Sequence, residues 1–297
     1  MDNVRITLPS GTARTVDSSA RIIDLLADEP EAQGTPSNPL VAANVNNEVL
    51  DLTTRITTNA QVTPVFLNSD AGVRTYRQAL CFLLAMASRH LFADRRLVIG
   101  HSLGDAYFFY YQDIDQVGQA DLDALTHRMQ ELVDQDLPIV RRSIAYTDAL
   151  EHFRSQGMDD TSMLLQHHNH AHVAVYTCGD FLDLAHGSLV PRTGILRHFE
   201  ISVLEPGFVL RFPGRSQPTV LGSYRPSELL FSIYQEYKQW GQILGVTSAG
   251  RLNQVITEGR VARFISVSEA LQEKKITQIA DAIAERSDQV KVVLIAG

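Results

Sequence analysis

Lysine and cysteine are scarce in this 297-residue chain, and it contains no long apolar run and no long basic run. Only four of the 26 basic residues are lysines, and the basic residues cluster no further than in pairs such as Arg141–Arg142. A nucleic-acid backbone is bound by many clustered cations, and the net charge here is −8. We therefore do not expect a nucleic-acid partner.

The apolar runs and the cysteines also indicate the cellular compartment of the protein. No run approaches the roughly 18–20 apolar residues that a membrane-spanning helix needs, and residues 1–12 show no basic segment followed by an apolar stretch. Cys81 and Cys178 cannot build a disulfide framework, so we expect two reduced thiols. These observations predict a cytoplasmic protein without a membrane partner.

The composition is that of a folded protein. Hydrophobic residues make up 44% of the chain and charged residues 20%, with 18 glycines and 11 prolines spread along it. This balance is typical of soluble globular proteins rather than disordered or fibrous ones. The length exceeds the roughly 100–200 residues usual for one domain, so two or more packed units are expected.

The first 69 residues predict a small α+β domain. Residues 3–8 alternate as a half-buried strand does, and residues 9–12 supply a turn into a second short strand. A helix is predicted over 20–28, because its apolar residues share one face. Further short strands then complete a domain over 1–69.

A second α+β unit is predicted over 70–222. Its first element is a helix over 73–92 with a broad apolar stripe, which should pack centrally. The remaining predicted elements are strands at 96–100, 106–114, 172–176, 196–203 and 207–212 and helices at 120–135 and 147–157.

The last part of the chain, 223–297, is predicted to be helical until its final residues. There KVVLIAG forms a short apolar run that ends in Gly297. Such a run is typical of a buried parallel strand that leads into a phosphate-binding loop.

Residues 100–104 read Gly-His-Ser-Leu-Gly and match the G-x-S-x-G pattern of a serine-hydrolase nucleophile. Asp183 and His186 follow in the chain order of such a triad. The site requires a helix directly after Ser102, because the helix N-terminus helps to stabilise an oxyanion. The aromatic run 107–111 favours a strand instead, so a serine hydrolase remains only an alternative.

Two further clusters could carry binding. Residues 167–172 hold four histidines that could ligate a transition metal, but no cysteine or carboxylate lies nearby at a ligand spacing, so we assign no metal site. Residues 107–111 could stack against bases or nucleosides. We expect instead that alternate members fill the core while the others face a cleft.

The order of these segments resembles the N-terminal half of threonyl-tRNA synthetases. ITLPSGTARTV and VAANVNNEVLDL resemble that family's ubiquitin-like TGS domain, and YRQALCFLL, RLVIGHSLGDAYFFYY and GDFLDLAHGSLVP resemble its editing domain. The resemblance covers about 200 residues. It implies a β-grasp TGS domain over 1–69 and an α+β editing-like domain over 70–222.

The family's editing residues do not carry over. The resemblance implies a His-x-x-x-His pair on the first helix and a Cys-x-x-x-His pair in a later loop, and these positions hold Gln78, Phe82, Ala185 and Leu189 here. Such side chains can neither ligate a metal nor transfer a proton as imidazole and thiolate do. We therefore expect no catalytic residue, no metal and no editing of mischarged tRNA by that chemistry.

The corresponding cleft still offers a binding site for a small molecule such as a nucleoside or an amino acid. An editing-type hydrolase remains the alternative function. The candidate cleft residues are Gln78, Phe82, His101, Asp105, Tyr107, His186 and Arg192.

The chain also resembles bacterial uridine or nucleoside kinases in which a TGS domain and a degenerate editing-like domain precede a P-loop kinase. That resemblance implies a non-catalytic regulatory or ligand-binding region, truncated where Gly297 begins the phosphate loop. The lysine and the serine or threonine of that loop are absent, so no cofactor is expected here, whereas the full-length kinase would use ATP and Mg²⁺. The expected partners are the missing kinase domain, the small molecule and a second copy of the chain.

Overall fold

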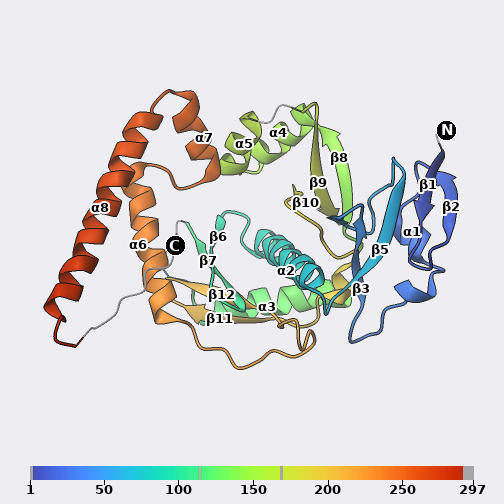
Figure 1. Cartoon of the computed structure of the whole chain (residues 1–297), viewed down its shortest axis with the longest axis horizontal. Coiled ribbons are helices and arrows are strands. Elements are labelled where there is room, and N and C mark those ends of the chain that lie inside the picture. The colour runs from blue at the N-terminus through green and yellow to red at the C-terminus, as the bar shows by residue number, and fades with distance from the viewer. Residues whose placement is uncertain (1–2, 113, 115, 168–169, 290–297) are drawn as a thin grey trace. The chain divides into compact units, whose positions relative to one another are not determined.

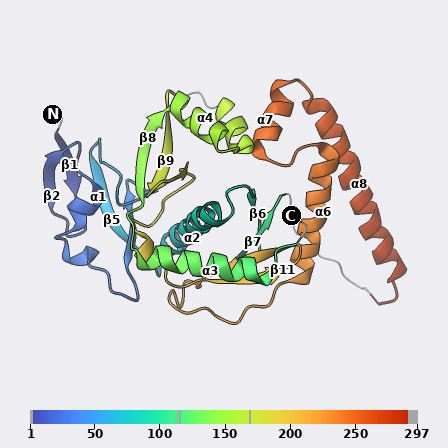
Figure 2. The same cartoon turned by 180° about the vertical axis from the view of Figure 1, so that it is seen from behind.

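The computed structural model has a mixed α+β architecture, as the sequence predicts, and divides into two compact units. Unit 1 comprises Met1–Ile144 and His172–Ser227, and unit 2 comprises Ala145–Ala171 and Glu228–Gly297. Figures 1 and 2 show the elements from opposite sides. The three predicted domains stay a prediction. The residues that the structure describes are 3–112, 114, 116–167 and 170–289.

The first sheet of unit 1 has five strands in the order β2-β1-β5-β3-β4. β1 pairs antiparallel with β2 and parallel with β5, and β3 lies antiparallel between β5 and β4. Asn46 and Asn47 have φ angles of 49° and 70° and form the two-residue turn between β3 and β4, because asparagine tolerates this left-handed conformation. The elements are β1 Asn3–Thr7, β2 Ala13–Asp17, α1 Ile22–Leu26, β3 Leu40–Val45, β4 Glu48–Leu50 and β5 Ala60–Phe66. The helix predicted over 20–28 is therefore present but shorter.

This five-stranded sheet contributes to two hydrophobic cores. One face packs on α1 in a small core that includes Ile6, Ile22 and Val62. The other face carries Val41 and Val65 into a larger core built around α2. Since successive side chains of a strand point to opposite faces, burial on both sides joins the N-terminal sheet firmly to the rest of unit 1.

The long helix α2, Asp70–Leu91, is the centre of the larger core. Its N-terminus is capped by Ser69, whose hydroxyl accepts the Gly72 N–H at 3.0 Å. A Cβ atom on Gly72 would lie 2.0 Å from the Phe66 carbonyl oxygen, so only glycine fits this close approach. Both views show α3, Gln119–Asp134, beside α2. These two helices confirm the sequence prediction.

The four-stranded sheet of unit 1 has the order β11-β12-β7-β6 and contains the aromatic run. Phe108 and Phe109 are adjacent on β7 and both are fully buried. Because adjacent side chains face opposite sides, the prediction that alternate members face a cleft is wrong for this pair. β7 ends at Tyr111, three residues earlier than predicted. The strands are β6 Leu97–Ser102, β7 Ala106–Tyr111, β11 Glu200–Leu204 and β12 Gly207–Arg211.

A three-stranded sheet, β10-β9-β8, completes unit 1. Its strands are β8 Val140–Ala145, β9 His172–Cys178 and β10 Phe181–Leu184. Only β9 was predicted. β8 carries two exposed arginines in its middle, and β10 is only four residues long, so neither shows the alternation that marks a half-buried strand.

The secondary structure in the described residues of unit 2 is mainly helical. α5 packs against α7, and a Cβ atom on Gly250 would lie 2.9 Å from the Met163 Cβ. Ser248 caps α7 and also donates to Asp160 at 3.0 Å. The helices are α4 Tyr146–Ser155, α5 Asp159–Gln166, α6 Glu228–Leu244, α7 Ala249–Thr257 and α8 Val261–Glu285. Of these, α5 and α7 were not predicted.

Two sequence predictions concern the end of the chain and membrane-spanning helices. The segment KVVLIAG, with Gly297, lies outside the described residues, so the predicted phosphate-loop start is untested. No helix in the described part of the chain combines the length and the apolar character that a membrane crossing requires.

Candidate functional site

The first half of α2 meets the loop that follows β10. The side-chain amide of Gln78 lies against Gly187, where an added Cβ atom would be 2.5 Å from Gln78 Oε1. One turn further along α2, the Phe82 ring meets Phe181 and Tyr176 edge-on, with centroid distances of 5.1 and 6.4 Å. Gln78 therefore lies beside the predicted loop, while Phe82 packs on the two strands that precede it.

The side chains at this junction do not fit a metal ion. Phe82 and Leu189 are each only 6% exposed and belong to the hydrophobic core, and Ala185 packs against that core. Gln78 supplies a neutral amide, which is a poor ligand for zinc. Among the described residues there is no group of three or more histidine, cysteine or acidic side chains that could hold a metal. The side chains at these four positions therefore lack the metal ligands that a metal-dependent hydrolase needs.

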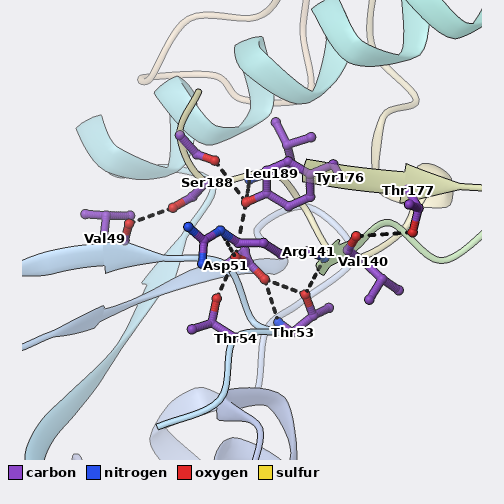
Figure 3. Close-up of polar contacts among 11 residues, drawn as sticks. Val49, Asp51, Thr53, Thr54, Val140, Arg141, Tyr176, Thr177, Ser188 and Leu189 are labelled. Carbon is purple, nitrogen blue, oxygen red and sulfur yellow. Dashed lines mark hydrogen bonds and ion pairs between the residues drawn. The ribbon is translucent and has the colours of Figure 1, made fainter. Parts of the chain in front are cut away.

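A buried carboxylate lies where the five-stranded sheet meets this loop (Figure 3). The side chain of Asp51 is 3% exposed. Its Oδ1 accepts from the backbone N–H of Thr53 at 3.0 Å and from the Thr53 hydroxyl, and its Oδ2 accepts from the Thr54 hydroxyl at 2.7 Å and from the Tyr176 hydroxyl at 3.1 Å. The Arg141 guanidinium approaches to 3.9 Å. These donors offset the cost of burying the charge.

Tyr176 connects this carboxylate to the loop. Its hydroxyl lies 2.9 Å from the Gly187 carbonyl oxygen and accepts the Leu189 N–H at 3.3 Å. Burial, together with the Asp51 carboxylate, raises the pKa of Tyr176 above its ordinary value, so the hydroxyl stays protonated. Ser188 makes a second connection by donating to the Val49 carbonyl at 2.7 Å. Sequence reasoning missed this network because its two links to the N-terminal sheet, Asp51–Tyr176 and Val49–Ser188, join residues 125 and 139 positions apart.

The other predicted cleft residues are not all brought together. Asp105 forms an ion pair with Arg77 at 3.2 Å, and Tyr107 meets the Phe212 ring at 5.0 Å, while Arg77 lies 4.3 Å above that same ring. Arg77 comes from α2, one residue before Gln78, and adjacent residues of a helix face different directions. Arg77 was not among the predicted site residues, whereas Asp105 and Tyr107 were.

His101, His186 and Arg192 complete the predicted set. His101 lies on β6 opposite Phe108, and His186 is exposed in the loop. Arg192 forms an ion pair with Asp136 at 2.8 Å. No described contact joins Arg192 to Gln78 or Phe82, so its placement with them stays a prediction.

Two thiols, the partly buried Cys81 and the buried Cys178, lie on elements that form the junction. Burial raises the pKa of Cys81, on α2, to about 12, and that of Cys178, at the end of β9, to about 11. At neutral pH both are thiols rather than thiolates, and a thiol is a poor nucleophile. They form no disulfide. Burial therefore disfavours the reactive thiolate form at both positions.

The serine-hydrolase alternative is wrong. Ser102 ends β6, Gly104 turns the chain with a φ of 69°, and β7 begins at Ala106. The segment is a β-hairpin and offers no helix N-terminus next to Ser102. A nucleophile elbow requires that helix for its oxyanion-binding N–H groups. The aromatic residues after the motif form the strand β7, as the sequence favours, instead of the helix that a nucleophile elbow needs.

The histidine-rich segment 167–172 lies between α5 and β9. His168 and Asn169 fall outside the described residues. Among the described residues, the histidines of this segment do not gather with other histidine, cysteine or acidic side chains into a group that could hold a metal ion.

Comparisons with known proteins agree with part of the predicted resemblance. No family model matches the chain. It is 29% identical over 203 residues to the threonine–tRNA ligase of Geobacter sp. (strain M21), and the match covers 68% of this chain and 31% of that protein. It is 30% identical over 198 residues to the threonine–tRNA ligase of Methylococcus capsulatus (strain ATCC 33009 / NCIMB 11132 / Bath), covering 66% and 30%.

The chain thus spans about a third of the length of these relatives. A third example, the threonine–tRNA ligase of Syntrophotalea carbinolica, is 29% identical over 201 residues. This similarity supports a relation to aminoacyl-tRNA synthetases and favours the editing-type alternative over the predicted uridine kinase, for which it gives no support. About two thirds of the chain is similar to threonine–tRNA ligases.

Proposed function

We propose that residues 1–222 are a TGS and editing-like domain pair related to threonyl-tRNA synthetases, which binds a small molecule, an amino acid or a nucleoside, without hydrolysing an ester. The strand order β2-β1-β5-β3-β4, with β1 and β5 parallel and α1 packed on one face, supports the β-grasp assignment. The similarity to threonine–tRNA ligases supports the pairing of the two domains.

The observation that carries the proposal is the junction between Gln78 and Gly187. The helix and the loop meet here, and by the resemblance the amide of Gln78 and the buried ring of Phe82 stand where that family carries reactive groups. Gln78 can donate and accept hydrogen bonds to a polar ligand. The amide, phenyl, methyl and isobutyl side chains at the four positions can neither ligate a metal nor take a proton from water. Binding without turnover is the chemistry that remains.

A ligand panel tests the binding. Thermal shift and calorimetry are run on the full chain with threonine, serine, adenosine, uridine and ATP. Saturable binding of one compound that Gln78→Ala weakens, and that Gln130→Ala on α3 leaves unchanged, supports the proposal. Gln130 is an exposed glutamine whose hydrogen bond among the described residues is to Asp134 in its own helix, so it controls for the substitution itself. A panel without any binding overturns the proposal.

The editing-type hydrolase is the second candidate, because the relatives are threonine–tRNA ligases. It predicts deacylation of Ser-tRNA(Thr) by the purified chain at a rate above the spontaneous one. The proposed binding function predicts the spontaneous rate, both with and without added zinc. Catalysed deacylation that Gln78→Ala abolishes would establish the hydrolase instead.

The kinase parent remains a separate proposal. It is tested by reading the coding sequence after residue 297, where a phosphate loop with its lysine and serine or threonine would support it. A continuation without such a loop would contradict it, and with it the expected use of ATP and Mg²⁺.

A further inference from the structure

The loop residues Gly187, Ser188 and Leu189, called the 187–189 loop below, are held by side chains and backbone from other elements. Tyr176 on β9 holds the Gly187 carbonyl and the Leu189 N–H through one hydroxyl, at 2.9 and 3.3 Å. The Ser188 hydroxyl donates to the carbonyl of Val49 on β4 at 2.7 Å. All three residues of the loop are therefore fixed, one of them directly by the N-terminal sheet (Figure 3).

The hydroxyl of Tyr176 has more acceptors than it can serve fully. It carries one proton, and both the Asp51 carboxylate, at 3.1 Å, and the Gly187 carbonyl, at 2.9 Å, lie within reach of it. Asp51 already accepts from Thr53 and Thr54. The carboxylate therefore has donors besides Tyr176, and its contact with the Tyr176 hydroxyl ties Asp51 to the same group that meets Gly187.

Gly187 of the 187–189 loop also borders the proposed site. Gly187 has the Gln78 amide against it, and the Phe82 ring lies edge-on to the Tyr176 ring. A change in the tether of this loop would therefore change the space next to Gln78. Tyr176 itself is 1% exposed and its ring belongs to the core, so it touches the loop without facing solvent.

We infer that Tyr176 is a positioning residue that sets the 187–189 loop beside Gln78, and that the N-terminal sheet, through Asp51 and Val49, holds it in that setting. The relevance to ligand binding rests on the proposed function. The N-terminal sheet then acts as a support for the site, and the conformation of the site depends on residues of β4 and the turn after it.

Hydrogen exchange measured by mass spectrometry tests this without any ligand. In the full chain, Tyr176→Phe keeps the ring but removes the acceptor of the Leu189 N–H. Exchange in a peptide spanning 185–191 should become between about twofold and tenfold faster, the range expected for one lost hydrogen bond. Ser188→Ala, which removes the contact to Val49, should accelerate the same peptide. Peptides from the middle of α2 should exchange as in the wild type.

Tyr111→Phe is the matched control. Tyr111 is also 1% exposed and its hydroxyl also bonds inside unit 1, to Ser88 at 2.8 Å, and no contact among the described residues joins it to the loop. It should leave the 185–191 peptide unchanged. Wild-type exchange of that peptide in both Tyr176→Phe and Ser188→Ala would overturn the inference, as would equal acceleration in Tyr111→Phe. Because no ligand is used, a silent ligand panel would refute the proposed function and leave this result standing.

Discussion

Gly187→Ala tests whether α2 and the 187–189 loop really meet at Gln78. The new Cβ atom would lie 2.5 Å from Oε1, 2.8 Å from Nε2 and 3.0 Å from Cδ of the Gln78 side chain. Ordinary contacts between heavy atoms lie near 3.5 Å, so the amide must move by roughly 1 Å. Overpacking costs about 1–3 kcal/mol. Since the crowded atoms are the end of a flexible side chain, we expect about 1 kcal/mol of lost stability.

Urea unfolding followed by circular dichroism measures this loss, which also corresponds to a fall of roughly 2–4 °C in melting temperature. Gln78→Ala removes the crowded atoms, so the double variant Gly187→Ala/Gln78→Ala should recover most of the loss. Residues in contact show such non-additivity. Gly214→Ala serves as the control, because its Cβ atom would meet nothing within 4 Å. An additive double variant, or a Gly187→Ala protein as stable as the control, would refute the junction described above.

Two further predictions follow from the buried groups of unit 1. Ser69→Ala should lower the free energy of unfolding by about 1 kcal/mol because the Gly72 N–H at the start of α2 loses its cap, whereas Ser69→Asp should retain most of the stability, and chemical denaturation distinguishes them. Cys178 is 1% exposed and its pKa is raised to about 11, so in the folded protein the thiolate fraction at pH 8 is smaller than in the unfolded chain. Iodoacetamide should therefore label Cys178 slowly in buffer and rapidly in urea, as measured by mass spectrometry, and equal rates would contradict the burial.

Much of the fold could be read from local patterns, while the exceptions share a physical cause. α2 and α3 carry apolar stripes that the sequence shows directly. β8 was missed because Arg141 and Arg142 interrupt its apolar residues, and its strand conformation depends on pairing with β9. The motif around Ser102 misleads because its three fixed residues say nothing about the aromatic strand that follows.

The candidate site also has features that the sequence could place and features that it could not. Gln78 and Phe82 could be placed on one helix from their spacing, and the resemblance supplied the loop that faces them. The tethers of that loop could not be predicted, because Asp51 and Tyr176 are 125 residues apart and neither belongs to a recognisable motif. A hydrogen-bond network between distant elements becomes visible only when the packing of the elements is known.

Restoring the family's reactive side chains gives the sharpest test of the site assignment. If Gln78, Phe82, Ala185 and Leu189 stand at former ligand positions, the variant Gln78→His/Phe82→His/Ala185→Cys/Leu189→His should bind about one equivalent of zinc, the number one tetrahedral site of three imidazoles and a thiolate would hold. Removing the phenyl ring costs stability, since Phe82 is buried between Tyr176 and Phe181, and zinc should restore part of it because only the folded chain gathers the four ligands. Dialysis followed by metal analysis, with the wild type and Ala185→Cys alone as controls, measures the stoichiometry. A folded quadruple variant that holds no more zinc than the wild type would show that α2 and the loop do not converge as an editing site does, and would remove the main support for the proposed function.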